Sequence, residues 1–281
     1  MKLLRYGPVG QEKTGLLDSE GRVRDLSAHA PDLAGEAVSK DALARLAQID
    51  PDSLPLVEEP GRIGACLARV PNFFCIGLNY AKHAAETGAQ PPAEPIIFSK
   101  ASSALSGPFD PVQIPRGSEK CDWEVELGVV IGRETLYVSE DEALDHVAGY
   151  CTINDVSERA FQIERGGQWI KGKSAPTFGP IGPWLVTADE IADPQALRVT
   201  LDLNGERVQD ETTGDMIFTV AQIVSHMSQF MKLMPGDVIA TGTPSGVGMG
   251  MKPQRFLKPG DVMEIEVEGL GRQRQDAVAA Q

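Results

Sequence analysis

The sequence has 281 residues, 42% of them hydrophobic, which is enough to bury a full core without disulfide support. Its formal net charge of −14 makes the chain acidic, so it repels the phosphate backbone of nucleic acids and anionic lipid surfaces. The chain starts without an apolar run of signal-peptide length, and no later run reaches the roughly 20 residues of a membrane span.

These properties favour a cytoplasmic protein that binds neither nucleic acid nor membrane. The cysteines include no CxxC pair, and two of the four lie in apolar stretches. We therefore expect buried free thiols in a reducing compartment. The cysteines are Cys66, Cys75, Cys121 and Cys151.

The first part of the chain differs in pattern from the rest. It contains a short strand pattern, a turn at residues 19–21, a helical stretch near residues 40–48 and a proline-marked connector at residues 50–55. We predict a small N-terminal α+β domain over residues 1–70 and a larger catalytic domain over residues 71–281.

The larger domain is typical of a strand-rich fold with Pro and Gly turns between the strands. Helical patterns interrupt it at residues 157–165 and 219–231. The βαβ alternation of a doubly wound sheet is missing, so we expect an α+β fold with a β-rich mixed sheet in a roll or barrel. The expected strands are residues 73–76, 96–99, 123–131, 149–154, 199–203, 238–241 and 262–267.

Two glutamates stand out in one of these strands. Glu124 and Glu126 are two residues apart, so in a strand their side chains point to the same face. Burying two adjacent carboxylates without a cation is unfavourable, and a hard divalent cation resolves the repulsion. Oxygen ligands favour Mg²⁺, Mn²⁺ or Ca²⁺ over Zn²⁺. The alternative is a solvated sheet face.

A third carboxylate, Asp155, follows the strand that ends at Asn154, where functional sites gather in sheet proteins. Arg159 and Gln162 come four and seven residues later, so a helix places them on roughly the same side as Asp155. A cation with three carboxylates beside a guanidinium and an amide suits a chelating carboxylate substrate. The alternative for Arg159 and Gln162 is an ordinary polar helix face.

A histidine and a glutamate lie three residues apart in a short helical segment. His83 and Glu86 would be neighbours on that helix. A carboxylate beside an imidazole fixes its tautomer and raises its basicity, which makes a base that can activate water. The alternative is a surface ion pair.

Residues 167–174 match the GxxxxGK[ST] pattern of nucleotide-binding loops. We reject a nucleotide site because a polar helix precedes the pattern and the proline-rich segment 175–183 follows it, where a helix is required. Lys173 remains a lone cation near the segment of Arg159. The Gly-rich turn at residues 241–248 offers backbone amides and the Thr243 hydroxyl to a ligand carboxylate, or is simply a tight turn.

Taken together, these segments resemble the fumarylacetoacetate hydrolase family over roughly residues 72–268. The order and spacing of the segments carry the resemblance. The markers are Gly77-Leu78-Asn79-Tyr80 with His83 and Glu86, Asp122-Trp123-Glu124-Val125-Glu126, Asn154-Asp155-Val156-Ser157 with Arg159, Gly172-Lys173-Ser174, and Thr241-Gly242-Thr243-Pro244 with Gly246-Val247-Gly248.

The resemblance implies a β-roll catalytic domain, a homodimer and one Mg²⁺ or Mn²⁺ ion. It also implies a lid that contains His83 and membership of the shorter bacterial subgroup. The implied metal ligands are Glu124, Glu126 and Asp155. The implied catalytic residues are His83, Glu86 and Lys173, and the implied substrate contacts are Arg159, Gln162, Lys173 and Thr243.

The implied activity is hydrolysis of the C3–C4 bond of a 2,4-diketo-3-deoxy sugar acid to pyruvate and lactate. The sequence resembles most the members that act on the L-rhamnonate or L-fuconate derivative. The alternatives on the same site are acylpyruvate hydrolysis, oxaloacetate decarboxylation, hydroxydienedioate isomerisation and ureidoglycolate lysis. A non-catalytic binding protein is the alternative from another class.

Overall fold

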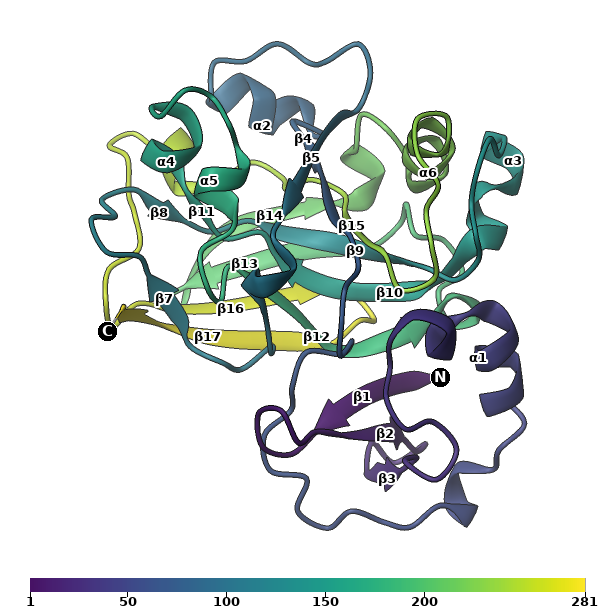
Figure 1. Cartoon of the computed structure of the whole chain (residues 1–281). Coiled ribbons are helices and arrows are strands. Elements are labelled where there is room, and N and C mark those ends of the chain that lie inside the picture. Colours follow the sequence, from purple (N-terminus) through teal and green to yellow (C-terminus); the bar gives the residue numbers. More distant parts are fainter. Residues whose placement is uncertain (281) are drawn as a thin grey trace.

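The computed structural model describes residues 1–280 and contains a large mixed sheet, a second smaller sheet and short helices (Figure 1). The large sheet has the order β3-β2-β1-β12-β10-β9-β15-β4-β5, and β6 pairs with β12. Its strands are β1 (Lys2–Tyr6), β2 (Lys13–Leu17), β3 (Val23–Asp25), β4 (Phe73–Gly77), β5 (Ile96–Lys100), β6 (Leu105–Ser106), β9 (Val125–Ile131), β10 (Val147–Asn154), β12 (Gly179–Thr187) and β15 (Val238–Ala240).

The second sheet has the order β14-β13-β16-β17-β7, and β8 pairs separately with β11. These strands are β7 (Val112–Ile114), β8 (Cys121–Asp122), β11 (Ser157–Glu158), β13 (Arg198–Leu203), β14 (Glu206–Thr212), β16 (Val262–Val267) and β17 (Arg272–Ala279). The α-helices are α1 (Lys40–Leu46), α2 (Ala81–Glu86), α3 (Glu140–Ala143), α4 (Arg159–Ile163), α5 (Ile170–Lys173) and α6 (Val220–Ser228). Short 3-10 turns are η1 (Gly35–Val38), η2 (Pro51–Ser53), η3 (Ser102–Ala104), η4 (Leu144–His146), η5 (Ala188–Glu190), η6 (Thr213–Asp215) and η7 (Gly248–Gly250).

The expected α+β, β-rich mixed fold is confirmed. Most strand pairs are antiparallel, whereas β15–β4, β12–β6 and β17–β7 are parallel. Within residues 1–280 the large sheet runs from β3 at one edge to β5 at the other. The sheet is therefore open, and of the two forms expected the roll is the one observed.

The central strands β9 and β10 are buried along their whole length. Leu127 and Val129 join the core shared with the second sheet, whereas Val130, on the opposite face of β9, packs with Leu3 and Leu43 of the N-terminal segment. A strand buried on both faces is an almost continuous apolar run, which is why the sequence pattern located it. Glu126 is therefore a carboxylate inside an otherwise apolar strand.

The N-terminal segment is joined directly to the large sheet. Strand β1 pairs with β12 in the register Lys2↔Val186 and Leu3↔Leu185, and β2 and β3 extend the sheet beyond it. Figure 1 shows this segment at the end of the molecule opposite α2, α4 and α5. The division of the chain at residue 70 stays a prediction.

Two expected elements differ in their boundaries. The strand expected over residues 123–131 starts only at Val125, because the N–H of Glu124 donates to the side chain of Asn154 and the N–H of Val125 donates to that of Gln209. The helix expected over residues 157–165 starts only at Arg159, because β11 pairs with β8 first.

The expected helix near residues 219–231 is α6. It begins after Thr219, whose hydroxyl accepts from the N–H of Gln222 while the Gln222 side chain accepts in return. All four cysteines are free and buried, as expected. Within residues 1–280, every helix is too short or too polar to cross a bilayer.

Candidate active site

Three carboxylates meet where β9 and β10 lie side by side. The antiparallel register Ile153↔Glu126 brings the end of β10 next to Glu126, and the N–H of Asp155 donates to the carbonyl of Glu124 at 2.8 Å. One oxygen from each of Glu124, Glu126 and Asp155 lies within 4.8 Å of the others, and all three side chains are buried. The strand break before Val125 and the turn after Asn154 thus complete the cluster.

Two buried lysines contact these carboxylates. Lys173 Nζ, at the end of α5, donates to Glu124 Oε2 at 2.5 Å and to Asp155 Oδ2 at 2.6 Å. Lys100 Nζ, at the end of β5, donates to Asp155 Oδ1 and to the carbonyl of Val156. Burial opposes the charge on Lys173, but Asp155 and Glu124 outweigh that effect and raise its pKa. These two carboxylates therefore favour the charged form of Lys173.

The two glutamates of the cluster have opposite electrostatic environments. Burial would raise the pKa of Glu124, but Arg159 and Lys173 outweigh it and hold that pKa well below its usual range. Burial, together with the charges of Asp155 and Glu124, raises the pKa of Glu126 well above its usual range. Glu126 accepts from the N–H of Gly242, and no basic side chain within residues 1–280 forms an ion pair with it. Glu126 is thus the carboxylate of the cluster that has no cationic partner.

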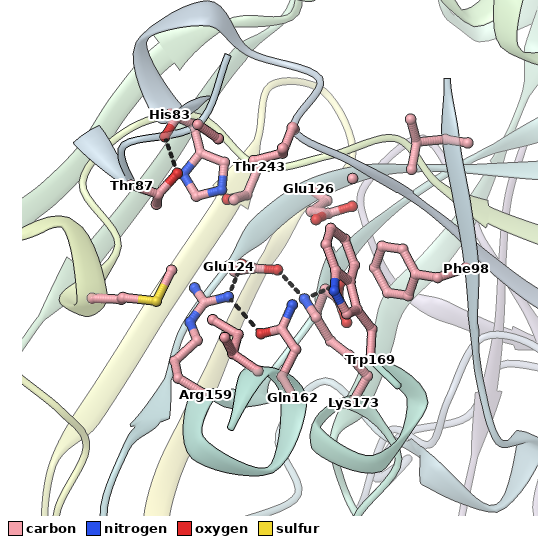
Figure 2. A pocket seen from close by; sticks show the side chains of 17 residues that line it. His83, Thr87, Phe98, Glu124, Glu126, Arg159, Gln162, Trp169, Lys173 and Thr243 are labelled. Carbon is pink, nitrogen blue, oxygen red and sulfur yellow. Dashed lines mark hydrogen bonds and ion pairs between the residues drawn. The ribbon is translucent and has the colours of Figure 1, made fainter. Parts of the chain in front are cut away.

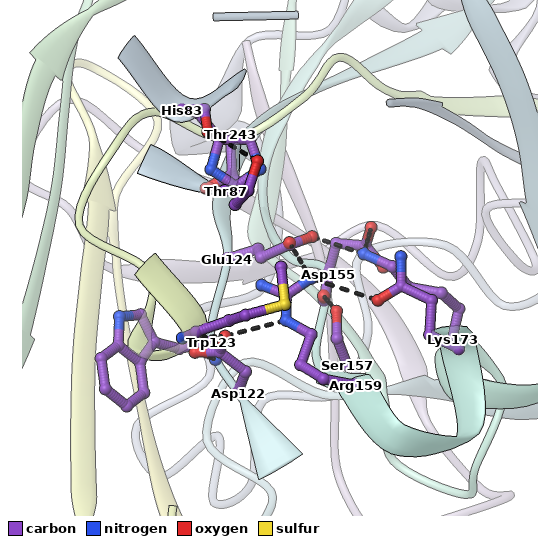
Figure 3. A network of polar contacts seen from close by, with 12 residues as sticks. His83, Thr87, Asp122, Trp123, Glu124, Asp155, Ser157, Arg159, Lys173 and Thr243 are labelled. Carbon is purple, nitrogen blue, oxygen red and sulfur yellow. Dashed lines mark hydrogen bonds and ion pairs between the residues drawn. The ribbon is translucent and has the colours of Figure 1, made fainter. Parts of the chain in front are cut away.

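Arg159 connects the cluster to a fourth buried carboxylate (Figure 3). Its Nε donates to Asp122 Oδ2 at 2.8 Å, and its Nη1 pairs with Glu124 Oε1 at 2.7 Å and reaches Gln162 Oε1 at 3.3 Å. Its Nη2 is buried without a hydrogen-bond partner. Arg159 lines the cavity, and this nitrogen is a buried donor without a partner.

The expected histidine–glutamate pair lies on α2. His83 Nδ1 and Glu86 Oε1 are 2.9 Å apart, and Glu86 Oε2 accepts from the N–H of Gly246 at 2.9 Å. With the proton on Nδ1 facing the carboxylate, Nε2 is left as the acceptor of the imidazole. His83 is buried and lines the same cavity as the carboxylate cluster.

One cavity of about 250 Å³ brings these groups together (Figure 2). Of the residues expected at the site, only Glu86 does not line it, because it stands behind His83. Figure 2 shows His83 and Lys173 on opposite sides, with Glu124 between them. The expected residues that line the cavity are His83, Glu124, Glu126, Asp155, Arg159, Gln162, Lys173 and Thr243.

The chain matches the family model described as fumarylacetoacetate (FAA) hydrolase C-terminal over residues 72–278. The chain belongs to the fumarylacetoacetate hydrolase family. It is 60% identical to a protein of Burkholderia ambifaria (strain MC40-6) that is named only as a hydrolase, with all of both chains covered.

Two solved structures align with this chain over the full length of both proteins. The fumarylacetoacetate hydrolase of psychrophilic Exiguobacterium antarcticum is 35% identical, with a TM-score of 0.88. The maleylpyruvate hydrolase of Sphingobium sp. SYK-6, solved with manganese(II) and pyruvate, is 27% identical, with a TM-score of 0.81.

The carboxylate cluster of this family member fits a hard divalent cation. Its three buried carboxylates offer oxygen ligands, and the elevated pKa of Glu126 marks the position where positive charge is missing. Mg²⁺ and Mn²⁺ both prefer oxygen ligands of this kind.

Thr243 lies at the cavity with its hydroxyl already engaged. Its Oγ1 donates to the carbonyl of Val125 at 3.0 Å and accepts from Gln209 Nε2 at 2.9 Å. The hydroxyl proton is thus used to hold the turn of residues 241–248 against β9, and a contact between Thr243 and substrate stays a prediction.

Several residues of the site escaped the reasoning from sequence. Lys100 ends an apolar strand, and that position was the available signal for a buried cation. Asp122 precedes the two glutamates, and its contacts with Arg159, Gly248 and Met249 come from distant segments. Phe98 and Trp169 line the cavity as an edge-to-face pair with ring centroids 5.2 Å apart.

The glycine of the rejected nucleotide-loop pattern has a packing role. A Cβ on Gly172 would lie 2.4 Å from the carbonyl oxygen of Glu158, so α5 approaches β11 and α4 too closely for any other residue. The short helix ends at Lys173, whereas a phosphate loop requires a helix to begin there. Lys173 instead donates to carboxylates.

Proposed function

We propose that the chain is a divalent-metal-dependent hydrolase that cleaves the C3–C4 bond of a 2,4-dioxo acid and releases pyruvate. The observation that supports this most is the single cavity between His83 and the carboxylate cluster. One wall offers a base, the other offers a cation site, and Lys173 lies beside the second. Hydrolysis of a carbon–carbon bond needs these functions together.

The proposed cation is Mg²⁺ or Mn²⁺, held by Glu124, Glu126 and Asp155, and it would supply a Lewis acid for the oxygens of the 2-oxo acid. His83, oriented by Glu86, takes a proton from water through Nε2, and the water oxygen bonds to C4. The C3–C4 bond then breaks, and its electron pair forms the enolate of pyruvate. Protonation of C3 gives pyruvate, and C4 leaves as a second carboxylic acid.

The remaining polar groups position and stabilise the substrate. The Nζ of Lys173 adds positive charge beside the developing enolate oxygen. Nη2 of Arg159 and the side-chain amide of Gln162 orient the carboxylate of the substrate. All three side chains belong to residues that line the cavity.

We infer, from the family resemblance, that the substrate is the 2,4-diketo-3-deoxy acid derived from L-rhamnonate or L-fuconate, and that the enzyme is a cytoplasmic homodimer. The test is to incubate chelator-stripped protein with 2,4-diketo-3-deoxy-L-rhamnonate, with and without Mg²⁺, and to assay pyruvate and lactate. Magnesium-dependent, equimolar release of both would support the proposal. Turnover of acylpyruvates or oxaloacetate, without turnover of the deoxysugar-derived acid, would favour one of the alternative activities.

The same assay with His83→Ala tests the assigned base. We expect a loss of at least about 100-fold in kcat, because proton transfer by a positioned base contributes on that scale. Metal binding, measured by calorimetry, should persist because His83 is not among the proposed ligands. A variant with activity within tenfold of the parent would overturn this assignment.

A further inference from the structure

The cavity has a limited supply of positive charge. Three basic residues line it within residues 1–280, namely His83, Arg159 and Lys173. Lys173 is engaged by two carboxylates, and Arg159 uses Nε and Nη1 for contacts inside the protein. Beyond these contacts, Lys173 Nζ keeps one N–H, and Arg159 keeps Nη2, which is buried without a hydrogen-bond partner. These donors are enough to bind one carboxylate group of a ligand.

The remaining wall of the cavity is largely apolar. It includes Leu78, Phe98, Ile163, Trp169 and Met249. Figure 2 shows Trp169 and Phe98 together beside Lys173. A negative charge held against such a surface loses its hydration without gaining a partner.

Trp169 is built into this wall and does not swing freely over it. A Cβ on Gly77 would lie 2.5 Å from the Trp169 ring, so the indole packs directly on the backbone of β4. The indole also forms the edge-to-face pair with Phe98. The apolar wall is therefore a fixed part of the site.

The basic residues next to the cavity have partners of their own. Lys82 on α2 lies 3.5 Å from Glu211, and Lys171 on α5 donates to the carbonyl of Arg165 at 2.7 Å. The guanidinium of Arg165 lies over the Phe161 ring at 4.7 Å. None of these three cations lines the cavity, so none is placed to receive a second carboxylate inside it.

The buried charges around the cavity limit the site in the same way. Asp122, Glu124, Glu126 and Asp155 are buried there with Lys100, Arg159 and Lys173, and Glu158 is buried directly before Arg159. The buried carboxylates therefore outnumber the buried cations. A second substrate carboxylate would enter a region that already carries more negative than positive charge.

We propose that the site selects 2,4-dioxo acids that carry a single carboxylate and an uncharged tail on C4, and discriminates against dicarboxylates. This inference rests on the proposed function of the site. It favours acylpyruvates and neutral deoxysugar-derived acids over dienedioates and other substrates with a second carboxylate.

The test compares two substrates that differ only at the end of the tail. The pair is 2,4-dioxoheptanoate and 2,4-dioxoheptanedioate, assayed with the magnesium-loaded enzyme for pyruvate release. We expect kcat/KM to be at least about 100-fold higher for the monocarboxylate, the scale of leaving a charged group unpaired in a specific site. Equal rates, or faster cleavage of the dicarboxylate, would overturn the selectivity and leave the hydrolase function standing. Turnover of neither compound, nor of the deoxysugar acid, would refute the hydrolase function.

Binding provides a readout that does not depend on cleavage. The probes 2-oxoheptanoate and 2-oxoheptanedioate lack the C4 carbonyl, so calorimetry measures their affinities without turnover. We expect tighter binding of the monocarboxylate even if no tested dioxo acid is cleaved. Tighter binding of the dicarboxylate would contradict the proposal.

A positive charge introduced into the apolar wall of the cavity should reduce the preference for monocarboxylates. Ile163 is half-exposed at the end of α4 and lines the cavity, so it tolerates a polar side chain. Ile163→Lys should lower the preference for the monocarboxylate at least about tenfold by pairing with the second carboxylate, whereas Ile163→Gln should leave the preference near the parent value. The same shift in both variants would show that charge is not the cause.

Discussion

The backbone N–H of Gly246 donates a 2.9 Å hydrogen bond to Oε2 of Glu86, 160 residues earlier in the chain. The other oxygen of this carboxylate faces Nδ1 of His83. The orientation of the proposed base therefore depends on the Gly-rich turn as well as on α2. Gly250 lies against the same carboxylate, because a Cβ there would be 2.5 Å from Cδ of Glu86.

Gly250→Ala should reduce kcat by about 10- to 100-fold, because the added methyl group displaces Glu86 and misplaces the imidazole. Metal affinity should stay at the parent value, because η7 holds none of the proposed ligands. Steady-state kinetics and calorimetric titration with Mn²⁺ measure the two effects. An unchanged kcat would show that Glu86 moves aside without disturbing His83.

Asp122→Asn should destabilise the fold and raise KM. Asp122 accepts from the N–H groups of Gly248 and Met249 and from Nε of Arg159. In the asparagine variant, the side-chain NH₂ group would face N–H donors that need an acceptor. Breaking a buried charge pair costs about 3 kcal/mol or more in the free energy of unfolding. Urea denaturation and substrate kinetics would test both effects.

Asp210→Asn is the matched control for Asp122→Asn. Asp210 pairs with Arg198 at 2.6 Å on the surface, where the two side chains are 38% and 61% exposed. A surface pair contributes only about 0–1 kcal/mol, so its loss should be small. Equal costs for the two substitutions would contradict the role of Asp122.

The sequence was sufficient to locate the carboxylate cluster because its evidence is local. Glu124 and Glu126 interrupt an apolar strand with period-two spacing, and Asp155 follows the end of another strand. Such patterns report which face a side chain occupies. They also located the histidine–glutamate pair, because the i,i+3 spacing of His83 and Glu86 is a property of a single helix.

The partners of these groups could not be predicted, because they depend on how distant segments pack. Lys100 reaches Asp155 across 55 residues, and Gln209 contacts the start of the strand at Val125 from 84 residues away. The apolar wall required the contact between Trp169 and Gly77, which no periodicity reports. Tertiary side-chain contacts therefore decide which charges and which apolar groups surround the cavity.

Lys100→Met should destabilise the metal-free protein by about 3 kcal/mol, because Asp155 loses one of its two cations inside the core. Saturating Mg²⁺ should recover part of this loss, because the ion adds positive charge to the same carboxylates. Denaturation with and without Mg²⁺ provides the measurement.

Lys13→Met is the control for Lys100→Met. Lys13 is an exposed lysine, 3.9 Å from Asp25, and should contribute little to the free energy of unfolding. If Lys100→Met were no more harmful than Lys13→Met, Lys100 would have no part in balancing the charge of the site.

Removal of the metal should make stability depend on pH through Glu126. In the metal-free protein, burial and the charges of Asp155 and Glu124 raise the pKa of Glu126 above the ordinary glutamate value of 4.5. The folded state therefore keeps a proton that the unfolded state loses, so the metal-free fold loses stability as pH rises from 4.5 towards the raised pKa. A bound dication displaces that proton, so metal should bind more tightly as pH rises through the same window.

Scanning calorimetry between about pH 5 and 8, with and without Mg²⁺, measures this linkage. The difference in melting temperature between the metal-loaded and metal-free protein should widen as pH rises. Glu126→Gln removes the titrating group, so the metal-free variant should lose less stability than the parent over that range. A difference in melting temperature that stays constant with pH would show that Glu126 is already ionised without the metal, and that Lys100, Arg159 and Lys173 neutralise the cluster.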